Sequence, residues 1–133
     1  MPCYDVVIEK AFEALKHAYA PYSKFYVGAC VKTYDAHYFL GANVENASYG
    51  LTNCAERNAI FAAYSNGYRK QDIEVIAIVS NAVKLTTPCG ACRQVLQELI
   101  KEDTPIVLCN RKETVVTNVK ALLPCSFNSE DLK

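Results

Sequence analysis

The sequence lacks several features that would direct it to a large or charged partner. It has no excess of charge of either sign, because 14 lysines and arginines balance 14 aspartates and glutamates. This balance excludes the basic field that gathers nucleic acid or an anionic membrane. No apolar run reaches the roughly 20 residues of a membrane span, and the first segment, MPCYDVVIEK, carries acids where a signal peptide needs a basic start. We therefore expect a cytoplasmic protein with a small neutral partner, and neither nucleic acid nor a membrane.

The chain also lacks internal repeats, low-complexity tracts and linkers. Its 133 residues therefore predict a single domain over residues 1–133, which is long enough to bury a core without disulfides. Apolar residues at helical and strand-like spacings predict the element order α, β, β, α, β, α, β, β, α. The expected helices lie at 4 to about 19, at 53–65, from Thr87 onward and around VKALLP, and the expected strands in FYVGACVKT, HYFLGANVE, IEVIAIVS, PIVLCN and ETVVTN.

Two connections in this order predict how the strands pair. The short YDA segment suits an antiparallel hairpin, whereas the helical crossover between Ile73 and Ile106 suits a parallel pair. At the start of that crossover helix, Thr87 is placed to cap the helix and Pro88 to occupy its first position. The sequence therefore predicts a layered α/β domain with a five-stranded mixed sheet.

Seven cysteines are present, an odd number that does not suit a disulfide framework in a reducing compartment. Cys30 in VGACVKT and Cys109 in PIVLCN lie in strand-like apolar runs, where a free cysteine packs as a small hydrophobe. At least some of the others are expected to bind a metal or to take part in catalysis.

The segment PCGAC places Cys89 and Cys92 three residues apart in the first turn of a predicted helix. Both sulfurs can therefore bind one tetrahedral metal ion. A redox Cys-x-x-Cys motif is an alternative, but it explains neither Cys54 nor Glu56. A structural zinc ribbon is another, but it needs a second close pair of cysteines, which the sequence does not contain.

Cys54 and Glu56 should point to opposite sides of a regular helix, because two residues turn it by about 200°. They can share a target on the helix axis, beyond its N-terminus. A zinc ion there would bind Cys54, Cys89 and Cys92, leave a fourth position for water, and have Glu56 beside it. The positive ends of two helices would stabilise the thiolates. Arg57 is expected to donate to cysteine sulfurs, with a solvated surface arginine as the alternative.

The segments CAE and PCGAC together resemble the motif of the zinc-dependent nucleoside deaminases, and the whole chain looks most like the small, tetrameric cytidine deaminases. Relatives that edit nucleic acids usually have His-x-Glu at the first ligand. The two histidines here, His17 and His37, lie in the first helix and beside the hairpin turn. The resemblance implies one Zn²⁺ per chain and a three-layer α/β/α sandwich.

Two further segments, YSKFYVGAC and GANVENASYG, resemble the substrate-binding parts of this family. The resemblance implies that Phe25 packs on the pyrimidine and that Asn43 and Glu45 hydrogen-bond the ribose hydroxyls. Backbone groups near Ala55 and Thr87 would orient the cytosine. The resemblance also implies a homotetramer in which some residues contribute to a neighbouring subunit's site: Ala47, Tyr49 and Phe127.

The reaction implied by the resemblance is hydrolytic deamination of cytidine and deoxycytidine to uridine and deoxyuridine, as in pyrimidine salvage. Glu56 would move protons from the zinc-bound water to N3 and then to the exocyclic amine, while the zinc-bound hydroxide attacks C4.

Three alternatives remain open. One is a deaminase for another aminopyrimidine nucleoside, including the blasticidin type. Another is a nucleic-acid editor, against which the neutral charge weighs. The third is a structural zinc module closed by a fourth cysteine, namely Cys30, Cys109 or Cys125.

Overall fold

A computed structural model describes residues 3–85 and 87–126. Helices and strands follow one another in the order predicted from the sequence. Their bounds are α1 (Asp5–Leu15), β1 (Val27–Thr33), β2 (Tyr38–Ala42), α2 (Ala55–Ser65), β3 (Ile73–Ser80), α3 (Gly90–Leu99), β4 (Ile106–Cys109), β5 (Thr114–Thr117) and α4 (Val119–Leu122). Single 3₁₀ turns lie at Tyr49–Leu51 and Lys70–Asp72.

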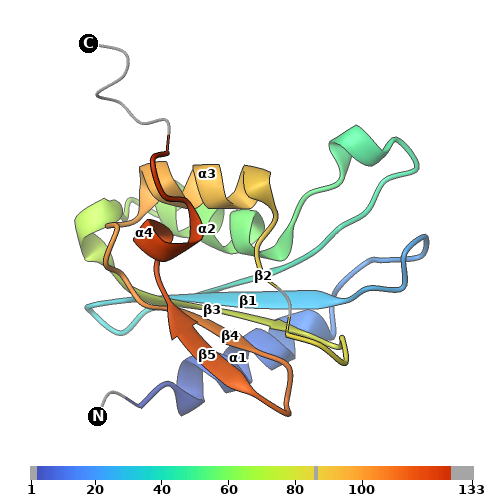
Figure 1. The fold of residues 1–133 in the computed structure, drawn as a ribbon, viewed down its shortest axis with the longest axis horizontal. Coiled ribbons are helices and arrows are strands. Elements are labelled where there is room, and N and C mark those ends of the chain that lie inside the picture. Colours follow the sequence, from blue (N-terminus) through green and yellow to red (C-terminus); the bar gives the residue numbers. More distant parts are fainter. Residues whose placement is uncertain (1–2, 86, 127–133) are drawn as a thin grey trace.

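The five strands form one mixed sheet in the order β2-β1-β3-β4-β5. β3 and β4 are parallel and are joined through α3, while the other neighbouring pairs are antiparallel. Helix α1 covers one face of the sheet, and α2, α3 and α4 lie on the other (Figure 1). The predicted three-layer α/β/α sandwich with a five-stranded mixed sheet is therefore confirmed.

The two faces of the sheet belong to different cores, because alternate strand residues point to opposite sides. In β1, Ala29 and Val31 pack beneath α2 and α3, whereas Cys30 packs against α1. In β4, Leu108 and Cys109 divide in the same way. Cys30 and Cys109 are both buried, as predicted for cysteines that pack as hydrophobes. Within residues 3–85 and 87–126, no helix is long and apolar enough to cross a bilayer.

Gly41 in β2 allows α2 to approach the sheet closely. A Cβ atom at this position would lie 2.4 Å from the carbonyl oxygen of Ala55 and 2.5 Å from the nitrogen of Ala59. Real Cβ atoms essentially never make contacts this short. The absence of a side chain at Gly41 therefore allows the first two turns of α2 to lie at their observed distance from the sheet. Those turns follow Cys54 and contain Glu56.

The first helix is shorter than predicted. It ends at Leu15 rather than near residue 19, because the backbone of Tyr19 pairs with a distant segment. The N–H of Tyr19 donates to the carbonyl of Asn43 at 2.9 Å, and its carbonyl accepts from the N–H of Glu45 at 2.8 Å. This pairing holds the segment that contains Asn43 and Glu45.

The predicted start of the crossover helix is also wrong. Helix α3 begins at Gly90, and its N-cap is Cys89 rather than Thr87. The Cys89 sulfur accepts a hydrogen bond from the N–H of Cys92 at 3.4 Å. Thr87 and Pro88 lie before the helix, and the Thr87 hydroxyl accepts a hydrogen bond from Arg93 instead of capping.

Candidate active site

Two helix N-termini meet at a cluster of three cysteine sulfurs. Cys54 is the N-cap of α2, Cys89 is the N-cap of α3, and Cys92 lies in the first turn of α3. The sulfurs of Cys54 and Cys89 are 3.9 Å apart, those of Cys89 and Cys92 are 3.2 Å apart, and all three lie within 4.8 Å of one another. A tetrahedral site with Zn–S bonds of about 2.3 Å sets its sulfurs about 3.8 Å apart. The cluster therefore fits a zinc ion held by three thiolates.

The sulfur cluster offers three protein ligands to a metal ion. Among the described residues, no fourth cysteine, histidine or carboxylate belongs to it. Three protein ligands leave one tetrahedral position for water or substrate, which distinguishes a catalytic zinc site from a closed structural one. This argues against the structural module closed by Cys30, Cys109 or Cys125.

Arg57 lies beside the sulfurs, and its Nη2 donates to the Cys54 sulfur at 3.4 Å. The hydrogen bond from Cys92 and the nearby Arg57 guanidinium lower the pKa of the Cys54 thiol to about 5. The pKa of Cys92 is raised above its usual range, because its proton is shared with the Cys54 sulfur and because it is buried. The cluster is therefore predisposed to hold a thiolate, the form of cysteine that binds metals.

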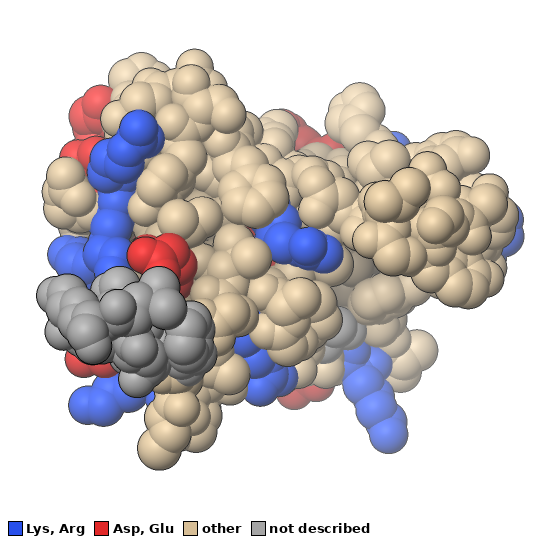
Figure 2. Space-filling view, turned by 90° about the horizontal axis from the view of Figure 1, so that it is seen from above, with Lys and Arg blue, Asp and Glu red and all other residues tan. Residues whose placement is uncertain are grey.

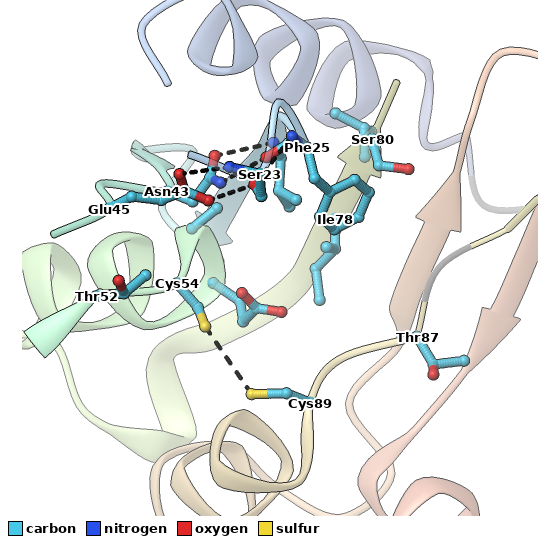
Figure 3. A pocket seen from close by; sticks show the side chains of 14 residues that line it. Ser23, Phe25, Asn43, Glu45, Thr52, Cys54, Ile78, Ser80, Thr87 and Cys89 are labelled. Carbon is cyan, nitrogen blue, oxygen red and sulfur yellow. Dashed lines mark hydrogen bonds between the residues drawn. The ribbon is translucent and has the colours of Figure 1, made fainter. Parts of the chain in front are cut away.

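Glu56 occupies the second position of α2 and is 5% exposed. Burial raises the pKa of its carboxyl group, and the charge of Cys54 acts in the same direction. The carboxyl group lines the same cavity as Cys54 and Cys89, which lie on adjoining helix ends in Figure 3. A buried carboxyl group with a raised pKa is suited to accept and release protons near neutral pH.

A cavity of about 420 Å³ opens beside the sulfurs, a size that suits a small organic ligand. Phe25, Val27 and Ile78 give it an apolar wall. In Figure 3, Phe25 and Ile78 lie across the cavity from Cys89. None of the described lining residues is lysine or arginine. A flat, uncharged ring could therefore pack on the apolar wall of the cavity, which Glu56 also lines.

Asn43 lines the cavity and also holds the segment that carries its apolar wall. Its Oδ1 accepts from the N–H of Val27 at 3.0 Å, and its Nδ2 donates to the carbonyl of Phe25 at 2.8 Å. A side-chain amide has two donor and two acceptor positions, so one of each remains for a ligand.

Glu45 holds the neighbouring turn in the same manner. It accepts hydrogen bonds from the backbone N–H groups of Tyr22 and Ser23 at 3.0 and 3.1 Å, and from the Ser23 hydroxyl. The hydrogen bond from Ser23 lowers the pKa of the carboxyl group, so Glu45 is ionised at neutral pH. Asn43 and Glu45, the residues predicted to bind the ribose, thus both line the cavity, and their side chains are held in place by hydrogen bonds.

The remaining predicted site residues have different positions. Ala55 and Thr87 line the cavity. Tyr49 lies outside it and lines an adjoining hollow of about 310 Å³, while Ala47 is exposed on the same loop. Phe127 lies outside the described residues. The hollow adjoins the cavity, because three residues line both of them: Ser23, Glu45 and Thr52.

Several cavity residues were not singled out from the sequence, among them Ser23, Thr52, Ile78 and Ser80. Ser23 lies inside the YSKF segment, two residues before Phe25, which was singled out. Ile78 and Ser80 come at the carboxyl end of β3. Ligands of α/β sheets bind beyond the carboxyl ends of parallel strands, and this rule could have indicated both residues.

Comparison with known families identifies the class to which this fold and site belong. Residues 1–108 match the family model of the cytidine and deoxycytidylate deaminase zinc-binding region, and this range contains all three clustered cysteines and Glu56. The chain belongs to this family of zinc-binding deaminases.

The most informative individual relatives all bear the name cytidine deaminase. The chain is 48% identical to the cytidine deaminase of Halalkalibacterium halodurans over 129 residues, which cover 96% of each chain. It is 40% identical to a probable cytidine deaminase of Dictyostelium discoideum, over 94% of this chain and 84% of that protein.

The fold is also similar to that of solved cytidine deaminase structures. The crystal structure of cytidine deaminase from Burkholderia pseudomallei superposes with a TM-score of 0.91 at 48% identity, covering 95% of this chain and all of that one. The enzyme of Mycobacterium tuberculosis superposes with a TM-score of 0.81 at 34% identity, covering 96% of this chain and 99% of that one.

Proposed function

We propose that this chain catalyses the hydrolytic deamination of cytidine and deoxycytidine to uridine and deoxyuridine, with one Zn²⁺ held by Cys54, Cys89 and Cys92. In this proposal, residues 1–133 form one catalytic domain. The observation that carries it is the placement of buried Glu56 in a ligand-sized cavity beside three sulfurs that leave one metal position open. A structural zinc site needs only its ligands, so it would not account for a buried carboxyl group that is not a ligand.

The chemistry divides between the metal and the chain. When bound, zinc would lower the pKa of a water molecule so that it becomes a nucleophile near neutral pH. Glu56 accepts a proton from the attacking water and delivers it to N3 of the cytosine as C4 becomes tetrahedral. It then carries a second proton to the exocyclic amine, which leaves as ammonia. Water and cytidine are consumed, and uridine and ammonia are formed.

The raised pKa of Glu56 suits this double task. A carboxylate with an ordinary, low pKa is a weak base and would accept the first proton poorly near neutral pH, although its protonated form would donate readily to N3. Burial raises the pKa of Glu56, which makes its carboxylate a stronger base for the first proton transfer. Arg57 stabilises the negative charge of a three-thiolate site through its bond to the Cys54 sulfur.

Substrate binding follows from the cavity walls. The cytosine ring packs on the Phe25 ring and the apolar side chains of Val27 and Ile78. Asn43 and Glu45 bind the ribose hydroxyls with their remaining hydrogen-bonding positions. The backbone near Ala55 and Thr87 orients the base, as the family resemblance implies. Groups that pair sugar hydroxyls favour a nucleoside over the free base, which carries no sugar hydroxyl at all.

The charge of the cavity favours a nucleoside over a nucleotide, although the family model covers deaminases of both kinds. The described residues lining the cavity and the adjoining hollow include ionised Glu45 and no lysine or arginine. A 5′-phosphate would meet a carboxylate instead of a cation. The same lack of basic side chains disfavours a nucleic-acid editor. The hydroxyl-binding groups favour ordinary cytidine over modified pyrimidine nucleosides.

We further propose a homotetramer in the cytoplasm that serves pyrimidine salvage, with Ala47, Tyr49 and Phe127 contributing to a neighbouring subunit's site. Large apolar side chains are exposed in the chain segments that border the cavity, namely Tyr22, Val44, Tyr49 and Leu51, and Tyr22 and Tyr49 line the adjoining hollow. The face above α2 and α3 is also mostly uncharged in Figure 2. Exposed apolar surface of this kind is typical of subunit contacts.

The proposal is tested by an ultraviolet assay of the purified protein with cytidine, before and after treatment with a zinc chelator. We expect loss of cytidine absorbance that stops on chelation and returns with added zinc. Cytidine 5′-monophosphate should react far more slowly under the same conditions. Stoichiometric zinc with no turnover over a panel of pyrimidine nucleosides would refute the proposal and favour a structural zinc module.

A further inference from the structure

Arg93, the fourth residue of α3, joins three parts of the chain that are separated in sequence. Its Nε donates to the carbonyl of Pro88 at 2.8 Å, its Nη2 to the hydroxyl of Thr87 at 3.0 Å, and its Nη1 to the carbonyl of Leu122 at 2.8 Å. Two of these acceptors belong to the residues just before Cys89. The third is the last residue of α4.

The guanidinium of Arg93 acts here as a geometric fork rather than as half of an ion pair. Among the described residues, none of the carboxylates lies within ion-pair distance of it. The carbonyl of Pro88 is that residue's one hydrogen-bonding group, since proline has no N–H. The carbonyl of Leu122 lies at a helix end, where carbonyls lack helical partners. A rigid planar fork fixes the relative positions of such acceptors, which the compact ammonium of lysine cannot do.

The segment held by this fork forms part of the candidate site. Thr87 lines the cavity, and Cys89 supplies one of the three clustered sulfurs. Between β3 and α3, the described residues adopt no helix or strand that would fix them. Their position relative to α4 therefore depends on contacts such as those of Arg93.

We propose that Arg93 is a positioning residue of the deaminase site, which sets the Thr87–Cys89 segment on the end of α4 so that the Cys89 sulfur and the cavity wall keep their places. This proposal rests on the proposed function. It also couples α4 to the site. Because Arg93 bonds both Leu122 and the residues just before Cys89, a displacement of α4 would shift the Cys89 sulfur.

The test compares the zinc-loaded variants Arg93→Gln and Arg93→Lys with the wild type. Three quantities are measured: the rate of zinc release to a chromogenic chelator, the dissociation constant of uridine by calorimetry, and kcat/KM for cytidine. For Arg93→Gln we expect zinc release to rise, uridine binding to weaken and kcat/KM to fall, each by about 10- to 100-fold. Arg93→Lys should resemble Arg93→Gln more than the wild type, because it retains the charge but not the fork.

The matched control is Arg111→Gln. Arg111 also makes a side-chain hydrogen bond, to Glu9 at 3.2 Å, and covers the ring of Phe12, but it lies on the α1 side of the sheet. This variant should keep all three quantities within about twofold of the wild type, since it touches no part of the site.

A purely structural role for Arg93 makes a different prediction. Thermal stability would then fall while zinc release, uridine affinity and kcat/KM of the folded protein stayed at wild-type values, and this result would overturn the proposal. If Arg93→Gln does not fold, Thr87→Val removes a single acceptor and should still accelerate zinc release. Zinc release is independent of turnover, so an inactive wild type refutes the proposed function, whereas an unchanged release rate refutes the role of Arg93.

Discussion

Replacing Gly41 with alanine tests whether the packing of α2 on β2 sets the position of the reacting groups. The new Cβ would lie 2.4 Å from the carbonyl oxygen of Ala55, whereas ordinary contacts begin at 3.4 Å. Helix α2 must therefore move away from the sheet by about 1 Å, at a cost of about 1–3 kcal/mol in the free energy of unfolding. Cys54 and Glu56 would move with it, and a misplacement of about 1 Å can lower activity by about 100-fold.

The control for this substitution is Gly28→Ala in β1. Its Cβ would lie 2.1 Å from the carbonyl oxygen of Ala11 in α1, on the opposite face of the sheet. Urea denaturation should show a similar loss of stability for both variants, while kcat/KM per folded molecule should fall much further for Gly41→Ala. If the two variants kept equal activity per folded molecule, the packing of α2 would not be what positions the site.

Two further substitutions test the electrostatics. Replacing Arg57 with glutamine removes the donor to the Cys54 sulfur, so zinc affinity should fall about 10- to 100-fold in competition with a chelator, and unchanged affinity would contradict this role. Asp35 has a pKa lowered from 3.8 to about 2 by hydrogen bonds from Thr33 and His37. A carboxylate with a lowered folded pKa stabilises the protein above its unfolded pKa, and this stability is lost as the pH falls through the folded pKa. The urea midpoints of the wild type and Asp35→Asn should thus differ near about pH 5 and converge towards about pH 2, and a constant difference would contradict the assignment.

The Cys89–Cys92 part of the sulfur cluster could be predicted from the sequence because its geometry is local. A Cys-x-x-Cys pair at a helix start sets both sulfurs on one side, and a cysteine at another helix start can meet them at the shared axis. The structure places Cys54 and Cys89 at the N-caps of α2 and α3, with their sulfurs in contact. The element order and the parallel pairing of β3 with β4 follow from equally local patterns.

The errors and omissions arise from contacts between distant residues. The periodicity of the first helix continues to Tyr19, but the pairing of Tyr19 with Asn43 and Glu45 ends the helix earlier. Thr87 is a good capping residue by type, yet its hydroxyl accepts from Arg93. The bonds from Asn43 to the Phe25–Val27 segment join residues 16 and 18 positions apart, which spacing alone does not reveal.

The central claim is that Glu56 moves protons beside the metal without binding it. The most direct test is to measure zinc content and cytidine turnover in one preparation of Glu56→Gln. The amide keeps the size of the side chain but cannot carry protons. We expect zinc to remain near one per chain while turnover falls by at least about 100- to 10,000-fold. Loss of zinc from this variant would make Glu56 a ligand, and retained turnover would remove it from the reaction; either result would contradict the mechanism.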